Sequence, residues 1–205
     1  MSKKYDTKKM ILMSLFMAII LIMAFTPNLG YIPLGVTRAT IIHIPVIVGS
    51  IILGPLPGAF LGFVFGVTSL INNTINPTVT SFCFSPFYTF MGINGGFLSL
   101  VICFVPRILV GIVPYYIVKL LKKINYNLSL ILAGLLGSLT NTLFVMNMIF
   151  IFFKEEYSLA KEIAVDTLYN VILSVIAING VPEAIVASIL TLFLIKAINK
   201  IYNRG

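Results

Sequence analysis

Long stretches of this sequence contain almost no charged residues. Residues 10–25, for example, are apolar apart from Ser14, and similar runs recur along the chain. Only 10% of the 205 residues are charged, whereas ordinary globular domains carry roughly 25%. A water-soluble fold of this length needs far more polar surface than 14 basic and 6 acidic residues can supply. Most of the surface must therefore face lipid, which predicts an all-α integral membrane protein.

The apolar runs predict six transmembrane helices in a single transmembrane domain that covers residues 1–205. We expect these helices at residues 10–25, 41–53, 59–71, 97–121, 128–153 and 168–198. The second and third are short, because thirteen residues at 1.5 Å each reach about 20 Å of a hydrocarbon core of roughly 30 Å. A turn rich in Gly and Pro at residues 54–58 reverses the chain between them. This pair is either extended into the interface or forms a re-entrant hairpin.

Basic residues lie at the helix ends, and their distribution predicts the orientation in the membrane. Short cytoplasmic loops retain Lys and Arg, whereas exported loops do not. With both termini in the cytoplasm, cytoplasmic segments hold ten of the 14 basic residues, and the outer loops keep Arg38, Lys154 and Lys161. We therefore predict cytoplasmic termini, with residues 1–9 as a cytoplasmic segment. Because the basic residues are scattered over helix ends, the net charge of +8 does not indicate nucleic-acid binding.

Two outer loops are expected to be structured and to cap a substrate pocket. Residues 26–40 contain Pro and Gly together with Arg38, and such a segment cannot lie in hydrocarbon unless protein covers it. Residues 72–96 mix Asn, Pro and Gly with aromatic side chains, which indicates a packed lid or a binding segment rather than a linker. From this second loop we take Asn72, Tyr88 and Asn94 as candidate binding residues.

The sequence lacks the motifs of membrane enzymes and of metal sites. It has no HExxH or GxSxG motif, and no arginine follows Glu155-Glu156 at the spacing of an EExxxR protease. His43 is the only histidine, and Cys83 and Cys103 are the only cysteines, so neither a zinc site nor a disulfide framework is indicated. A phosphate-binding loop is also missing. We predict that the chain is not an enzyme and that any ATP-driven step uses other chains.

Polar residues inside the predicted helices are the strongest candidates for a binding site, since each is costly in lipid unless it faces the bundle interior or a cavity. They are Arg107, Asn141, Asn147, Asn170, Asn179 and Glu183. Hydrogen bonds that only join helices explain any single Asn equally well. The four Asn residues together lie toward the outer halves of their helices, which favours a polar cavity open to the outside.

Arg107 and Glu183 are expected at about the same depth, and two interpretations remain open. In the first, they form a structural ion pair between two helices. In the second, Arg107 faces the cavity and binds an anionic ligand group bidentately, while Glu183 holds the guanidinium group in place. If the pair is structural, Arg38 in the first outer loop becomes the next candidate for the anion.

Small residues form two patterns that permit close helix packing. Gly58, Gly62 and Gly66 form a stripe on the third helix, and we expect this stripe to pack within the chain. Ser14 and Ala18 form a similar pair on the first helix. This second pair either packs internally or is the place where a partner membrane protein docks.

Several segments spread over nearly the whole chain form a pattern. They read IPVIVG (residues 44–49), LGPLPG (53–58), VPRILVG (105–111), TNT (140–142) and NGVPE (179–183). Together they resemble the substrate-binding (S) components of energy-coupling factor (ECF) vitamin transporters. The resemblance implies a six-helix protein in the plasma membrane of a prokaryote, which captures a vitamin or vitamin precursor from outside.

The resemblance also implies partners and functional residues. S components associate with an energising transmembrane subunit and two cytoplasmic ATPases that use ATP, so this chain needs no cofactor of its own. In the family an Ala-x-x-x-Ala pair on the first helix contacts the energising subunit, and Ser14 and Ala18 are the matching positions. The substrate lies near the outer surface, between outer loops and the last three helices, which agrees with the polar cavity expected from the residues themselves.

The substrate is indicated by two segments of the first outer loop. GYIPLG (residues 30–35) and TIIHIP (residues 40–45) resemble the pantothenate-type branch. Riboflavin, other B vitamins and hydroxymethylpyrimidine remain alternatives, because 16 Phe and 9 Tyr offer stacking surfaces for a flat ring even without Trp. A stand-alone membrane facilitator or a structural membrane protein is the alternative from another functional class.

Overall fold

A computed structural model describes residues 7–27, 29–34 and 37–202 of the chain. Within these residues the helices are α1 (Thr7–Phe25), α2 (His43–Leu53), α3 (Pro55–Ile75), α4 (Phe97–Val110), α5 (Val113–Leu121), α6 (Tyr126–Phe152), α7 (Lys154–Lys161), α8 (Leu168–Val175) and α9 (Val181–Tyr202). Three short helical segments are η1 (Ser81–Cys83), η2 (Val165–Thr167) and η3 (Ile176–Gly180), of which η3 is π-helical. Two antiparallel hairpins are β1–β2 (Tyr31–Leu34, Thr37–Thr40) and β3–β4 (Thr89–Phe90, Ile93–Asn94).

The predicted class of a helical membrane protein is confirmed. Five helical stretches are long and apolar enough to cross a membrane. They are Thr7–Phe25, Pro55–Ile75, Phe97–Leu121, Tyr126–Phe152 and Val165–Ile201. The apolar helix α2 is shorter, with 11 residues, and reaches about 16 Å.

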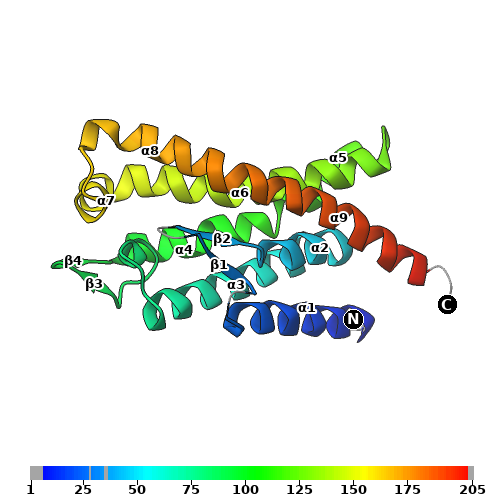
Figure 1. Ribbon diagram of the computed structural model, residues 1–205. Helices are drawn as coiled ribbons and strands as arrows, with labels where there is room; N and C mark the ends of the chain where they lie inside the picture. Colours follow the sequence, from blue (N-terminus) through cyan, green and yellow to red (C-terminus); the bar gives the residue numbers. More distant parts are fainter. Residues whose placement is uncertain (1–6, 28, 35–36, 203–205) are drawn as a thin grey trace.

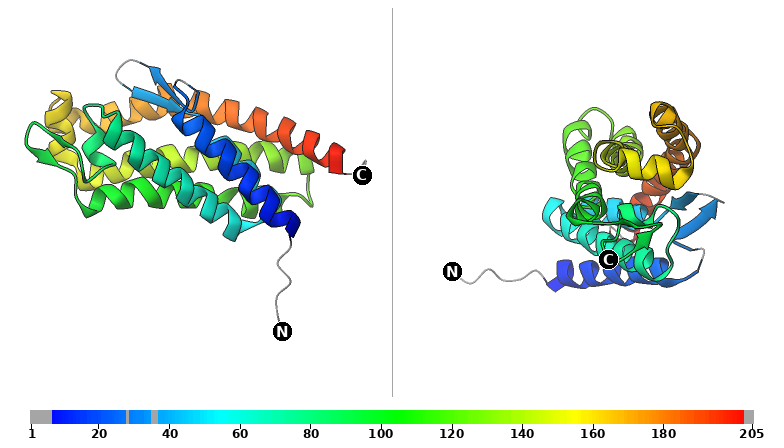
Figure 2. Two further views of the ribbon diagram at one scale, coloured as in Figure 1. Left: turned by 90° about the horizontal axis from the view of Figure 1, so that it is seen from below. Right: turned by 90° about the vertical axis from the view of Figure 1, so that its left-hand side faces the viewer.

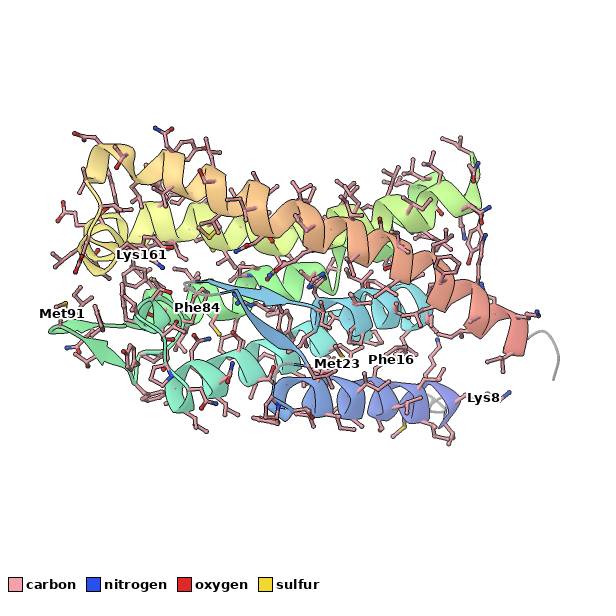
Figure 3. All side chains as sticks on the ribbon, in the orientation of Figure 1. Lys8, Phe16, Met23, Phe84, Met91 and Lys161 are labelled. Carbon is pink, nitrogen blue, oxygen red and sulfur yellow. The ribbon has the colours of Figure 1, made fainter. Side chains whose placement is uncertain are left out.

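The helices form one elongated bundle with two chemically different ends (Figure 1). α1 begins and α9 ends at the same end, which we call the termini end, whereas β3, β4 and α7 lie at the opposite loop end. The loop end carries two lysines, the exposed Lys154 and the partly buried Lys161 of α7, whereas seven exposed lysines belong to segments at the termini end: Lys8, Lys9, Lys119, Lys122, Lys123, Lys196 and Lys200. Figure 3 shows Lys8 at this end. The loop end carries Glu155 and Glu156 in the first turn of α7.

Two elements lie on the outside of the bundle. Figure 2 shows α1 crossing the other helices obliquely on one side, and the β1–β2 hairpin lying beside the α8–α9 stretch. Only 17% of the apolar stretch of α1 is buried, against 28% to 50% for the other candidate spans. α1 is therefore the most exposed of these helices.

The third helix is longer than the expected residues 59–71. α3 begins at Pro55, because proline is favourable in the first turn of a helix, where its missing N–H group needs no partner. It continues to Ile75 through polar residues that bond their own preceding turn. Asn73 Nδ2 donates to the Ser69 carbonyl at 2.8 Å, and Thr74 Oγ1 donates to the Leu70 carbonyl at 2.8 Å.

The expected fourth helix, residues 97–121, is divided at Gly111 and Ile112 into α4 and α5. Pro114 lies in the first turn of α5, whereas Pro106 lies inside α4 without ending it. A proline at position 106 cannot donate to the Ile102 carbonyl four residues before it. The Arg107 side chain replaces this missing donor, because its Nη1 donates to the Ile102 carbonyl at 2.7 Å.

The last span departs from a regular α-helix in its middle. Pro182 lacks a backbone donor, and the turn before it is π-helical, with the Val181 N–H bonded to the Ile176 carbonyl. The expected helix at residues 168–198 is therefore α8, η3 and α9 in succession. Asn179 and Gly180, at the end of the π-helical segment, are both buried.

The glycine stripe of α3 packs against α4, which confirms the predicted packing within the chain. A Cβ atom at Gly58 would overlap the Gly111 carbonyl, and one at Gly62 would overlap the Arg107 carbonyl. At Gly66 an added Cβ would lie 2.6 Å from the Phe104 ring. The two backbones therefore touch along this seam, and the Cys103 thiol donates to the Gly66 carbonyl across it at 3.3 Å.

Gly62→Ala tests this seam, because a substitution that usually stabilises a helix should here destabilise the protein. In an exposed helix, Gly→Ala stabilises by about 1 kcal/mol, but here the added methyl group must push two backbones apart. We expect a loss of about 1–3 kcal/mol, seen as a Tm about 3–10 °C lower in thermal unfolding of the detergent-purified protein. Gly96→Ala is the matched control, since no atom lies within 4 Å of its added Cβ. A Tm for Gly62→Ala equal to or above that of the unmodified protein would contradict the close seam.

Candidate ligand-binding site

Buried apolar side chains form two separate clusters along the bundle. The termini-end core includes Ile20, Ile47, Phe65, Val110, Ala133 and Ala187. The loop-end core includes Phe82, Ile102, Val145, Ile149, Leu168 and Ile172. α4 and α6 contribute to both cores, so the division falls partway along these two helices.

Between the two cores the helices turn polar side chains toward the interior. These residues, which we call the polar layer, are His43, Ser69, Arg107, Ser138, Asn141, Thr142, Asn179 and Glu183. Each of them is at most 9% exposed. On α4, for example, Arg107 lies between Ile102 of the loop-end core and Val110 of the termini-end core. A buried polar group is costly without a partner, so this set of buried polar groups is the candidate site for a polar ligand.

Arg107 occupies the α3–α4 side of the polar layer. Besides the bond from Nη1 to the Ile102 carbonyl, Nη2 donates to Ser69 Oγ at 3.4 Å. The guanidinium carbon lies 5.2 Å from the centre of the Phe84 ring and 5.7 Å from that of Phe65, which allows cation–π attraction. Nε is buried and has no hydrogen-bond partner among the described residues. The arginine thus retains donor capacity and carries an uncompensated positive charge.

Glu183 occupies the opposite side, near the first loop. Its Oε1 accepts a hydrogen bond at 2.8 Å from the backbone N–H of Thr40, the last residue of β2. This bond joins the β1–β2 hairpin to the first turn of α9. The carboxylate therefore fixes where the chain enters α2, which begins three residues after Thr40.

The ion pair expected between Arg107 and Glu183 does not form in the described part of the chain. Arg107 bonds to Ile102 and Ser69, whereas Glu183 bonds to Thr40. The side chain of a helical residue points back toward the N-terminus of its helix, which directs Arg107 along α4 toward the carbonyl left free by Pro106. The two charged residues belong to the same polar layer, but each has its own partners.

α6 and η3 bring two of the predicted asparagines into the layer. A Cβ at Gly180 would lie 2.8 Å from Thr142, so α6 and η3 approach closely at this point. Asn141, next to Thr142, is buried, and its Oδ1 has no partner among the described residues. Asn179, next to Gly180, is buried on the other side of the same contact.

Other predicted site residues of the helices and outer loops lie away from the polar layer. Asn147 is only partly buried and donates to the Leu143 carbonyl of its own helix at 2.8 Å. Asn72 Oδ1 accepts from Asn76 at 3.2 Å near the end of α3. Both side chains are thus used in local hydrogen bonds.

The remaining predicted residues belong to the loops. Asn94 is exposed in β4, where its Oδ1 accepts from Thr89 Oγ1. Tyr88 is partly buried against the loop-end core. Arg38 lies in β2, but its side chain is outside the described part of the structure.

Four members of the polar layer were missed by sequence reasoning: His43, Ser69, Ser138 and Thr142. Hydroxyl groups are common in membrane helices because they can bond their own backbone, so their presence alone carries little signal. His43 lies near the start of the helix expected at residues 41–53, and sequence reasoning gave it no binding role. It is 1% exposed at the start of α2, because the β1–β2 hairpin carries this junction into the bundle.

η1 and α7 cover the loop-end core with groups that stay un-ionised at neutral pH. Burial raises the pKa of the Cys83 thiol well above its usual range and raises the pKa of Tyr157 to about 12. Lys161 of α7, whose pKa is lowered by partial burial, lies in the same half of the bundle as Phe84 and Met91 (Figure 3). Neither the Cys83 thiol nor the Tyr157 phenol is therefore activated as a nucleophile. Within the described ranges, no group of three or more His, Cys, Asp or Glu residues can hold a metal ion.

Ser14 and Ala18 lie on the exposed face of α1. Their neighbours on this face are the exposed apolar residues Ile11, Leu15 and Ile22. The Ser14 hydroxyl donates to the Met10 carbonyl at 3.0 Å, so its hydrogen-bond donor is already used within α1. Small side chains here leave a shallow stretch of helix surface that another helix can approach.

Comparison with known proteins gives one family and close relatives. The family described as "ECF transporter, substrate-specific component" matches residues 8–195, which include the polar layer and α1 from its second residue. The chain is 37% identical over 210 residues to the pantothenic acid transporter PanT of Lactococcus lactis subsp. cremoris (strain MG1363), covering 99% of this chain and 100% of that protein. It is 31% identical over 193 residues to the pantothenate transporter PanT of Leuconostoc mesenteroides subsp. mesenteroides (strain ATCC 8293), covering 90% of this chain and 88% of that protein.

Proposed function

Because the chain belongs to the family of substrate-specific components of ECF transporters, we propose that it captures pantothenate within its polar layer. The observation that carries this proposal is the buried Arg107, which retains an unpartnered Nε and has no carboxylate partner among the described residues. An arginine placed this deeply in a membrane bundle requires a compensating anion. Pantothenate has one carboxylate, and the two relatives bear the name of a pantothenate transporter.

The proposed topology has six spans, with α2 as the sixth and shortest. The lysines of the termini end fit a cytoplasmic location for both termini, since short cytoplasmic loops retain basic residues. The loop end then faces outward, and the β1–β2 hairpin, η1 and α7 cap the polar layer from outside. The chain is a multi-pass membrane protein and a transporter component, not an enzyme.

The proposed partners are an energising transmembrane subunit and two cytoplasmic ATPases. ATP is used by the ATPases, and the substrate-capturing chain needs no cofactor of its own. We place the contact with the energising subunit on the Ser14–Ala18 face of α1, because α1 is the most exposed candidate span and this face carries small side chains.

Binding of pantothenate to the purified chain tests the proposal directly. We expect a saturable heat signal in titration calorimetry and a rise in Tm with pantothenate concentration, because a ligand that binds only the folded state stabilises it. Riboflavin and hydroxymethylpyrimidine serve as comparison ligands and should leave the Tm unchanged. Binding of either comparison ligand in place of pantothenate would contradict the assigned substrate. Pantothenate uptake by the chain alone, in liposomes without the other subunits, would instead indicate a stand-alone facilitator.

A further inference from the structure

His43 is among the most completely buried side chains of the polar layer, and its ring can both donate and accept hydrogen bonds. It is the first residue of α2 and is 1% exposed. Neither Nδ1 nor Nε2 makes a hydrogen bond of good geometry in the described part of the chain, although the backbone of Thr40 lies close enough to interact with the ring. A neutral imidazole ring offers one donor and one acceptor, so its acceptor capacity is unused inside the bundle even if Thr40 takes the donor.

Helix packing brings Asn141 to the level of His43. A Cβ at Gly137 of α6 would lie 3.0 Å from Ile47 Cδ1 of α2, which fixes one point of contact between these helices. α2 and α6 run in opposite directions (Figure 1). One helical turn back from Ile47 is His43, and one turn onward from Gly137 is Asn141. The unpartnered Oδ1 of Asn141 therefore lies at the same depth as the imidazole ring.

The neighbourhood of these two residues differs from that of Arg107. Thr40, three residues before His43, is bonded to Glu183, so this part of the layer lies between the hairpin, α2, α6 and α9. The side-chain partners of Arg107 come from α3 and the loop after η1, namely Ser69, Phe65 and Phe84. The layer thus has a cationic side at Arg107 and a neutral hydrogen-bonding side at His43 and Asn141.

We propose that His43 and Asn141 form a subsite for the neutral, hydroxyl-bearing end of the ligand, while its anionic end lies at Arg107. A hydroxyl group donates and accepts at once, which matches an imidazole ring beside an amide oxygen. The inference rests on the proposed function, and pantothenate has the required polarity: a carboxylate at one end and two hydroxyl groups at the other. Apolar residues at both positions would fill the same space more favourably in a purely structural role, because they leave no buried polar group unpaired.

The test compares two ligands and two substitutions. The ligands are pantothenate and N-(3,3-dimethylbutanoyl)-β-alanine, which has the same skeleton and carboxylate but lacks both hydroxyl groups. The unmodified protein should prefer pantothenate by about tenfold or more, because a site built to bind a hydroxyl group rejects an analogue without it. His43→Leu and Asn141→Leu should each reduce this preference several-fold while leaving the affinity for the analogue nearly unchanged.

A second measurement separates binding from folding. Removing an unpaired buried polar group should raise the Tm of the ligand-free protein in both variants, although the affinity for pantothenate falls. Ser50→Ala is the matched control, since Ser50 also lies buried on α2 with an unpartnered hydroxyl but packs against Gly58 of α3. This control should keep the full preference for pantothenate.

The outcomes distinguish the subsite from the proposed function. If the unmodified protein binds pantothenate but His43→Leu and Asn141→Leu keep the full preference over the dideoxy analogue, the subsite is wrong and the function stands. If either substitution lowers the Tm and weakens the binding of both ligands equally, the residues have a structural role, and this result also overturns the subsite. If the unmodified protein binds neither ligand, the proposed function itself fails.

Discussion

Replacing Ala18 of α1 by Trp is expected to abolish ATP-driven pantothenate uptake while leaving pantothenate binding unchanged. Ala18 is exposed on the outer face of α1, one turn from Ser14, and contributes to neither apolar core. A large ring at this position keeps the helix of a partner from approaching, because helix association in lipid depends on close packing of small residues. The polar layer lies on other helices, so the affinity for the ligand should not change.

Two measurements check this prediction. Uptake of labelled pantothenate is followed in liposomes that contain the chain, the energising subunit and both ATPases, and binding is measured on the chain alone. Ile189→Trp on α9 is the matched control, because it adds the same ring at another exposed apolar position. Undiminished uptake by the Ala18→Trp complex would show that α1 is not the docking face.

Replacing Arg107 by Met should remove the preference of the protein for an anionic ligand. The unmodified chain is expected to bind pantothenate more than about tenfold more tightly than pantothenol, in which a hydroxymethyl group replaces the carboxylate. Loss of one partner of a desolvated charged hydrogen bond costs about 2–5 kcal/mol, so Arg107→Met should weaken pantothenate binding by about 30-fold or more. The affinity for pantothenol should change little, and the ratio of the affinities for pantothenate and pantothenol should approach one.

Arg107 also has a structural role, and this role requires a separate control. Its Nη1 satisfies the Ile102 carbonyl that Pro106 leaves free, and an unpaired buried carbonyl costs about 1–3 kcal/mol. Removing an uncompensated buried charge offsets this loss, so we expect Arg107→Met to stay folded. Arg107→Lys keeps a charge but loses the planar fork, and should show an intermediate preference. If Arg107→Met keeps the unmodified ratio of affinities, the carboxylate binds elsewhere, and Arg38 becomes the candidate.

Hydropathy was enough to predict five helical stretches that are long and apolar enough to cross a membrane, because burial in lipid imposes the same demand on every turn of a helix. The boundaries were less predictable where side chains bond their own backbone. Asn73 and Thr74 suggested the end of a helix, yet each donates to the turn before it and allows α3 to continue. Pro106 suggested an interruption, yet the neighbouring arginine supplies the missing donor.

Position along the bundle was easier to predict than direction within it. Arg107 and Glu183 were expected to meet because they lie at similar depth. The rotation of each helix depends on irregular turns, and the π-helical segment at Ile176–Gly180 adds a residue that turns all later positions by about 100°. The sequence contains no simple signal for such a rotation.

Contacts between distant parts of the chain were the least predictable. The bond from Thr40 to Glu183 joins residues 143 positions apart and draws the first loop toward the last helix. This contact holds the end of the hairpin against α9, three residues before the buried His43. A single sequence shows the loop and the helix, but not that one carboxylate connects them.

The seam between α3 and α4 limits how the protein can change shape. Side chains that interdigitate can slide past each other by changing rotamers, but backbones in direct contact at Gly58 and Gly62 have no such freedom. α3 and α4 must therefore move as one rigid body, and they carry Arg107 with them. The position of Arg107 relative to α3 is therefore the same before and after a ligand binds, and any rearrangement must take place in other parts of the bundle.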